Sequence, residues 1–319
     1  MVSNITGLIE GYMNGNAWEE LCVKCYRIRY QSDNYTEIPA ISGGDAGIEG
    51  FTNKGIVHQC YCPERDYSDN ELYEHLRDKL TNDIEKLKNN ADRLKKFGVP
   101  QIIEWHFNIP LYKDARIITH AESKRQEVIK AKKENPLKYE HISDDFKIVI
   151  KTADDFSLEI SRIIRTSLTD MKLNLEITHT DNIDWTKCDS IKVSNIRRKI
   201  KTVMLLEEDN DALNNLVRIY VECYINGLEI MGNLRVKFPE IYEDIFKLAQ
   251  SYKRDVTIKT LMNTDKKMNA SLFHEMLDEF HRKLEKDFSK ILTEASIGEL
   301  KQDLVASWLA DCSLEFRGE

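Results

Sequence analysis

The spacing of hydrophobic residues divides the chain into two regions of different character. Up to about residue 155, short apolar runs typical of strands alternate with amphipathic helical segments. From about residue 156 onward, apolar side chains recur at three- and four-residue steps, which indicates helices. The pattern therefore predicts an α/β domain over residues 1–155, followed by an all-α helical domain over residues 156–319.

The first region predicts a mixed sheet flanked by helices. Asn16 and Glu19 form a capping pair that opens a first helix. A β-hairpin joins residues 48–51 to residues 55–62, after a short β-type run at 35–41. A long amphipathic helix then runs from a cap at Ser68 or Asp69 to about Phe97. A strand over 101–110, a helix over 121–135 and a strand over 146–152 complete the region.

The second region predicts helices with short polar breaks between them. The expected helical segments are 155–175, 190–206, 209–231, 238–263, 270–294 and 297–311. No sequence motif in this half indicates a catalytic or ligand-binding activity. We interpret it as a helical bundle or arm used for sensing, oligomerisation or docking on a partner.

Composition and charge fit a cytoplasmic protein with no membrane association. The 319 residues are 41% hydrophobic and 31% charged, with a formal net charge of −8. Because the chain is acidic overall, contact with nucleic acid would require a local basic face. The apolar runs are far shorter than the ~20 residues needed to cross a bilayer. The N-terminus lacks the features of a secretory signal, and seven scattered Cys residues indicate reduced thiols.

Candidate chemistry gathers in the stretch GGDAGIEGFTNKGIVHQCYC, residues 43–62. Glu49 begins one strand of the expected hairpin, and Asp45 lies in the turn before it. Gln59 and Tyr61 are two residues apart on the next strand, so they are expected to face the same way. Glu20, on the preceding helix, can reach the same cleft. Hard oxygen ligands that converge in this way are typical of divalent-metal phosphodiester hydrolysis.

These motifs resemble the PD-(D/E)XK superfamily of restriction-endonuclease-like nucleases, in its Mrr-like branch. The turn Gly-Asp-Ala-Gly-Ile-Glu-Gly at residues 44–50 is similar to the family's GDGGIDG turn, with Glu49 at the acidic metal-binding position. Gln59 matches the first residue of the family's Gln-x-Lys ending. The resemblance implies a restriction-endonuclease-like fold and a DNA endonuclease that holds Mg²⁺ or Mn²⁺ through Asp45, Glu49 and Gln59. It also implies an effector of a prokaryotic restriction or anti-phage system, working as a homo-oligomer or in a multi-subunit defence complex.

One departure from the family leaves two functions open. Tyr61 stands where the family has Lys, and a neutral Tyr supplies no fixed positive charge at pH 7. Lys79 or Lys86 on the following helix can replace it, and Lys79 is nearer the strand. The residues then assigned to catalysis are Glu20, Asp45, Glu49, Gln59, Tyr61 and Lys79. Alternatively, the nuclease is degenerate and serves as a DNA-binding scaffold that docks on a partner such as an ATPase.

Other features admit further interpretations. Zinc could bind the four thiols of Cys22, Cys25, Cys60 and Cys62, although their positions favour structural thiols between helix and sheet. A basic segment of the first domain is a candidate DNA contact, consisting of Lys124, Arg125, Lys130, Lys132 and Lys133. A second basic segment lies at residues 192–201, and for either segment alone a solvated helix face is the favoured interpretation. Action on RNA is a third possible function, through aromatic residues of the strand at 101–110.

Overall fold

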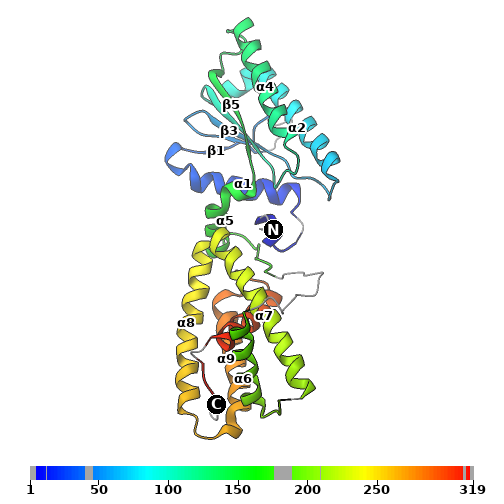
Figure 1. Ribbon diagram of the computed structural model, residues 1–319. Coiled ribbons are helices and arrows are strands. Elements are labelled where there is room, and N and C mark those ends of the chain that lie inside the picture. The colour runs from blue at the N-terminus through cyan, green and yellow to red at the C-terminus, as the bar shows by residue number, and fades with distance from the viewer. Residues whose placement is uncertain are drawn as a thin grey trace. The chain divides into compact units, whose positions relative to one another are not determined.

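The computed structural model describes residues 5–11, 13–39, 46–175, 189–208, 210–311 and 314–316 (Figure 1). The fold is mixed α/β, with a five-stranded sheet and a larger helical portion. The chain divides into two compact units, one built mainly from Gly11–Ile163 and the other mainly from Ile164–Glu319. We call them the α/β unit and the helical unit.

The sheet of the α/β unit is mixed, with its strands in sequence order. Its strands are β1 (Thr36–Glu37), β2 (Gly50–Phe51), β3 (Ile56–Cys60), β4 (Ile102–Asn108) and β5 (Ile142–Lys151). The expected hairpin is confirmed, because β2 and β3 pair antiparallel with Gly50 opposite His58. β1 pairs antiparallel with β2, whereas β3, β4 and β5 run parallel to one another.

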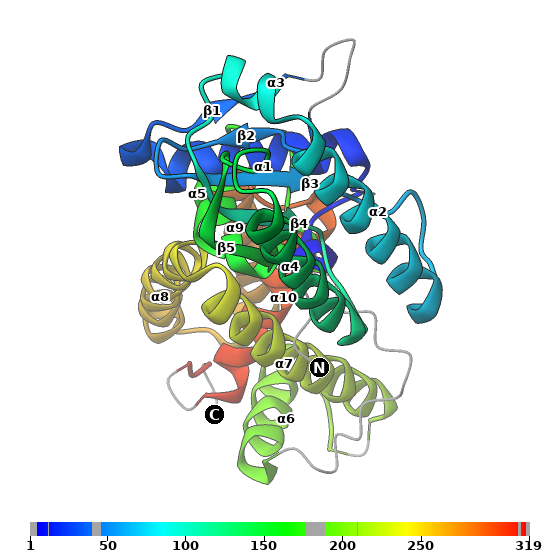
Figure 2. The same cartoon turned by 90° about the horizontal axis from the view of Figure 1, so that it is seen from above.

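Helices cover both faces of this sheet (Figures 1 and 2). They are α1 (Gly15–Arg29), α2 (Asp69–Asn89), α3 (Ala91–Lys96) and α4 (Arg116–Glu134). Alternation along β4 fixes the two faces. Trp105 and Phe107 join the apolar core with α2 residues such as Leu80. His106 and Asn108 face α1, where both hydrogen-bond to Tyr26.

The ends of two helices differ from the sequence prediction. Asn14, not Asn16, caps α1, and its side chain accepts a hydrogen bond from the Ala17 backbone N–H. Ser68 caps α2 as expected, in a reciprocal capping box with Glu71. However, α2 ends at Asn89, and the short helix α3 takes up the rest of the expected length.

The helical unit is built from long helices with buried apolar stripes. They are α6 (Ser190–Met204), α7 (Asp211–Lys237), α8 (Pro239–Met262), α9 (Asn269–Phe288) and α10 (Glu294–Ala310). The helix expected at 155–175 is α5 (Ser157–Arg165), which ends well before residue 175 and spans the boundary between the units. Across the described parts of the chain, no helix is both long and apolar enough to traverse a bilayer.

Candidate functional site

The side chains of Glu49 and Gln59 meet at the end of β3. Gln59 Nε2 donates a hydrogen bond of 2.6 Å to Glu49 Oε1. The backbone N–H of Cys60 donates one of 2.9 Å to Glu49 Oε2. The backbone of Glu49 is held by its own N–H, which donates to His58 O at 2.7 Å. The hairpin therefore fixes both residues of the predicted site in direct contact.

Burial gives the Glu49 carboxyl an unusual protonation equilibrium. Only 8% of Glu49 is exposed, and this burial raises the pKa of Glu49 to about 8. The nearby charge of Glu19 raises this pKa further, whereas hydrogen bonds from Cys60 and the charge of Lys79 lower it. An ionised Glu49 is therefore costly unless a cation compensates its charge.

Gln59 leaves an acceptor unused beside this carboxyl. Gln59 is 1% exposed, and among the described residues its Oε1 is buried without a hydrogen-bond partner. An unsatisfied buried acceptor typically costs about 1–3 kcal/mol. A carboxylate oxygen and the oxygen of a neighbouring amide are hard donors of the kind that Mg²⁺ prefers. The donor chemistry of this pair therefore fits the proposed cation.

On α1, the charge of Glu19 acts on Glu49, whereas the expected Glu20 points to solvent. The Glu20 side chain is 69% exposed and pairs with Lys24 at 2.7 Å. Glu19, in contrast, influences the pKa of Glu49. A cavity of about 430 Å³ adjoins this part of α1 and is lined by Asn16, Glu19, Glu20, Val23, Lys24, Arg27 and Glu37. The helical phase could have favoured Glu19, because Glu19 lies four residues before the buried Val23.

Both candidate lysines lie beside a buried carboxylate of α2, and the charge of Lys79 also acts on Glu49. Both Lys79 and Lys86 form ion pairs of 2.9 Å with the fully buried Asp83. The charge of Lys79 lowers the pKa of Glu49. Tyr61 follows the last residue of β3 and packs against the apolar core. Asp45 lies outside the described residues.

The basic segment on α4 is only partly available to a nucleic acid. Lys130 and Lys133 are exposed. Lys124 pairs with Glu127, and Arg125 pairs with Glu122, each at 2.7 Å. Lys132 is 8% exposed, pairs with Asp144 and donates to the carbonyl of Ile142. The expectation that all five form one basic face is therefore wrong for Lys132, because its ammonium anchors α4 to β5.

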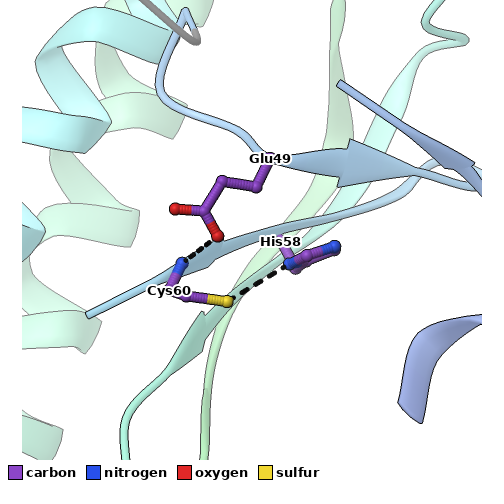
Figure 3. Close-up of side chains that lie close together, drawn as sticks. All are labelled: Glu49, His58 and Cys60. Atoms are coloured by element: carbon purple, nitrogen blue, oxygen red, sulfur yellow. Dashed lines mark hydrogen bonds between the residues drawn. The ribbon is translucent and has the colours of Figure 1, made fainter. Parts of the chain in front are cut away.

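A second polar group lies at the same strand end (Figure 3). Potential ligand atoms of Glu49, His58 and Cys60 lie within 4.8 Å of one another, and all three residues are buried. Burial lowers the pKa of His58 to about 3. Among the described residues, the four cysteines of the zinc interpretation form no common cluster, although the thiols of Cys22 and Cys60 influence each other's pKa.

Comparison with known proteins does not place the chain in a family. No family model matches it, no curated protein matches its sequence, and no solved structure matches its fold. The resemblance to PD-(D/E)XK nucleases therefore rests on the residues of the hairpin and the helices beside it.

Proposed function

We propose that the α/β unit is a metal-dependent DNA endonuclease with a restriction-endonuclease-like fold. The observation that carries this proposal is the contact between Glu49 and Gln59, which joins a buried carboxyl to an amide whose oxygen has no hydrogen-bond partner within the described parts of the chain. We also propose that the protein is a cytoplasmic effector of prokaryotic restriction or anti-phage defence, in a homo-oligomer or a larger complex. The family resemblance supports this setting.

Each residue of the site has its own role in the proposed reaction. Glu49 and Gln59 hold Mg²⁺ or Mn²⁺ through their side-chain oxygens, and the Gln59 amide turns so that Oε1 faces Glu49. The bound ion stabilises charge on the phosphate and lowers the pKa of the attacking water. Lys79 contributes the positive charge that Tyr61 does not supply. Glu19 accepts a proton at the side of α1 that lines the cavity.

Plasmid cleavage with Mg²⁺ or Mn²⁺ tests this assignment. We expect Glu49→Ala to abolish cleavage. Glu19→Gln should lower the rate by about 100-fold, within the usual range for a general base. Glu20→Gln is the matched control, because the neighbouring Glu20 is exposed and pairs with Lys24. Equal cleavage by wild type and Glu49→Ala would refute the assigned site.

A second matched pair isolates the role of Lys79. Lys79→Met should lower the cleavage rate by about 100-fold if its charge supports the reaction. Lys86→Met removes a charge from the same helix and the same partner, Asp83, and should leave the rate within a few-fold of wild type. Equal effects of the two substitutions would assign the loss to the ion pairs with Asp83 rather than to Glu49.

A second candidate function is a catalytically degenerate DNA-binding or scaffold module that docks on a partner such as an ATPase. Two observations favour it. Glu49 and Gln59 are only 8% and 1% exposed, and Tyr61 occupies the motif Lys position while packing on the core. Wild-type protein that binds duplex DNA with a steep salt dependence, yet never cleaves it with Mg²⁺ or Mn²⁺, would support this function over the first.

A further inference from the structure

Three ligands of different chemistry converge at the end of β3. They are a Glu49 carboxylate oxygen, a ring nitrogen of His58 and the Cys60 Sγ (Figure 3). Cys60 Sγ and His58 Nδ1 are 3.7 Å apart. In a tetrahedral zinc site, with Zn–S of about 2.3 Å and Zn–N of about 2.0 Å, two such ligands are about 3.5 Å apart. The spacing between His58 and Cys60 therefore already suits one edge of such a site.

Hydrogen bonds hold the His58 ring in the form that binds a metal. The Asn108 side-chain nitrogen lies 3.3 Å from His58 Nδ1 and donates to it when the ring proton is on Nε2. Nδ1 then carries the lone pair, and Nε2–H donates to the Tyr35 hydroxyl at 2.8 Å. Metal-bound His residues usually donate their second ring N–H to such a partner, which fixes the tautomer.

A hydrogen-bond donor also lies beside the sulfur ligand. The amide nitrogen of Asn108 lies 3.7 Å from Cys60 Sγ and can donate a hydrogen bond to a thiolate there. Asn108 is fully buried, so its amide stays directed at this point. One buried side chain thus contacts both ligand atoms; its hydrogen bond to Nδ1 would give way to the metal, and its contact with the sulfur would remain as outer-shell support.

We propose that Glu49, His58 and Cys60 form a site for a thiophilic divalent cation of the Zn²⁺ class. Thiolate and imidazole select such ions, whereas the oxygens of Glu49 and Gln59 suit Mg²⁺. On binding near neutral pH, the S–H bond of Cys60 and the O–H bond of the protonated Glu49 carboxyl break, sulfur–metal and oxygen–metal bonds form, and two protons leave to solvent.

This site has a regulatory consequence that rests on the proposed function. Glu49 belongs both to the thiophilic site and to the pair with Gln59. When its carboxylate binds Zn²⁺, it is not available to Mg²⁺. We therefore expect Zn²⁺ to inhibit cleavage and excess Mg²⁺ to relieve the inhibition.

Cobalt substitution tests the site without any measurement of cleavage. Co²⁺ added to the metal-free wild-type protein should give a sulfur-to-cobalt charge-transfer band that saturates at one ion per chain. X-ray absorption of the Zn²⁺-loaded wild type should show sulfur together with lighter nitrogen or oxygen ligands. A metal shell without sulfur in the wild-type protein would overturn the proposal, and so would the absence of bound metal.

Matched cysteine variants then assign the sulfur. Cys60→Ser should lose the cobalt band, whereas Cys25→Ser should keep it, because Cys25 is also buried but is not part of the cluster. Circular dichroism should confirm that both variants fold, and the wild-type absorption spectrum decides the question if Cys60→Ser does not. A cobalt–sulfur band without any DNA cleavage would leave this site standing and count against the nuclease. DNA cleavage without the cobalt–sulfur band would support the nuclease and count against this site.

Discussion

Replacing Glu49 by Gln should stabilise the α/β unit. Burial raises the pKa of Glu49 from 4.5 to about 8, so the folded protein resists its ionisation whereas the unfolded chain does not. Below about pH 4.5 the carboxyl is protonated in both states, and no stability is lost. As the pH rises toward 8, the unfolded state releases this proton first and becomes progressively favoured. At about 1.4 kcal/mol per pKa unit, the cost is about 3 kcal/mol at pH 7 and about 5 kcal/mol above pH 8.

Glu49→Gln removes this cost because the amide is neutral at every pH. The new side chain can still accept the Cys60 N–H, and the Gln59 amide can turn to present its oxygen to the new amide nitrogen. We expect a variant that is more stable than the wild type, by an amount that grows between about pH 4.5 and 8, yet inactive in cleavage. A residue that costs stability and is required for activity is typical of a functional site.

The assay is urea unfolding without metal ions at about pH 5, 7 and 9. Hydrogen exchange of β3 and β4 peptides reports on the α/β unit separately from the helical unit. Glu20→Gln is the control, because the Glu20 side chain is 69% exposed. A Glu49→Gln variant that is no more stable than wild type at about pH 9 would refute the reasoning, and so would a difference that does not change with pH.

The remaining predictions concern parts of the fold outside the candidate site. Asp303 is 3% exposed, and burial raises its pKa to about 7. In urea unfolding, Asp303→Asn should therefore stabilise the helical unit by about 2–4 kcal/mol at pH 8 and have no effect below about pH 4. Gly227→Ala would bring a Cβ within 3.0 Å of the Asp303 Cβ and 3.2 Å of its backbone oxygen, so we expect a loss of about 1–3 kcal/mol in the same assay, despite the better helix propensity of Ala. Ser68→Ala removes the capping box with Glu71 and should lower stability by about 1 kcal/mol, with faster hydrogen exchange confined to the first turn of α2; unchanged exchange there would contradict the assignment of the cap.

Local chemistry allowed several elements to be predicted from sequence. The hairpin of β2 and β3 follows from two apolar runs around a turn that contains Gly55, whose φ of +78° suits glycine. The start of α2 follows from Ser68 and Glu71. Glu49 and Gln59 were expected to line one cleft because the hairpin brings their segments together, and the structure shows their side chains in contact.

Features that depend on distant parts of the chain were missed or misplaced. The choice of Glu19 over Glu20 depends on the rotation of α1 against the sheet, which the burial of Trp18 and Cys22 determines. The sequence placed Tyr61 within the second hairpin strand. In the structure β3 ends at Cys60, and the Tyr61 ring packs against the core.

The sequence by itself determined the mixed α/β character of the first region, the helices of the second and the residue types of the candidate site, because these depend on periodicity and on neighbours in the chain. Only the tertiary structure decided which side chains have shifted pKa values and which side chains contact one another. The high pKa of Glu49 and the unused oxygen of Gln59 arise from burial by segments distant in sequence. The same is true of the meeting of His58 and Cys60 with Asn108 on β4. Desolvation and hydrogen-bond geometry belong to the packed chain, and local sequence does not encode them.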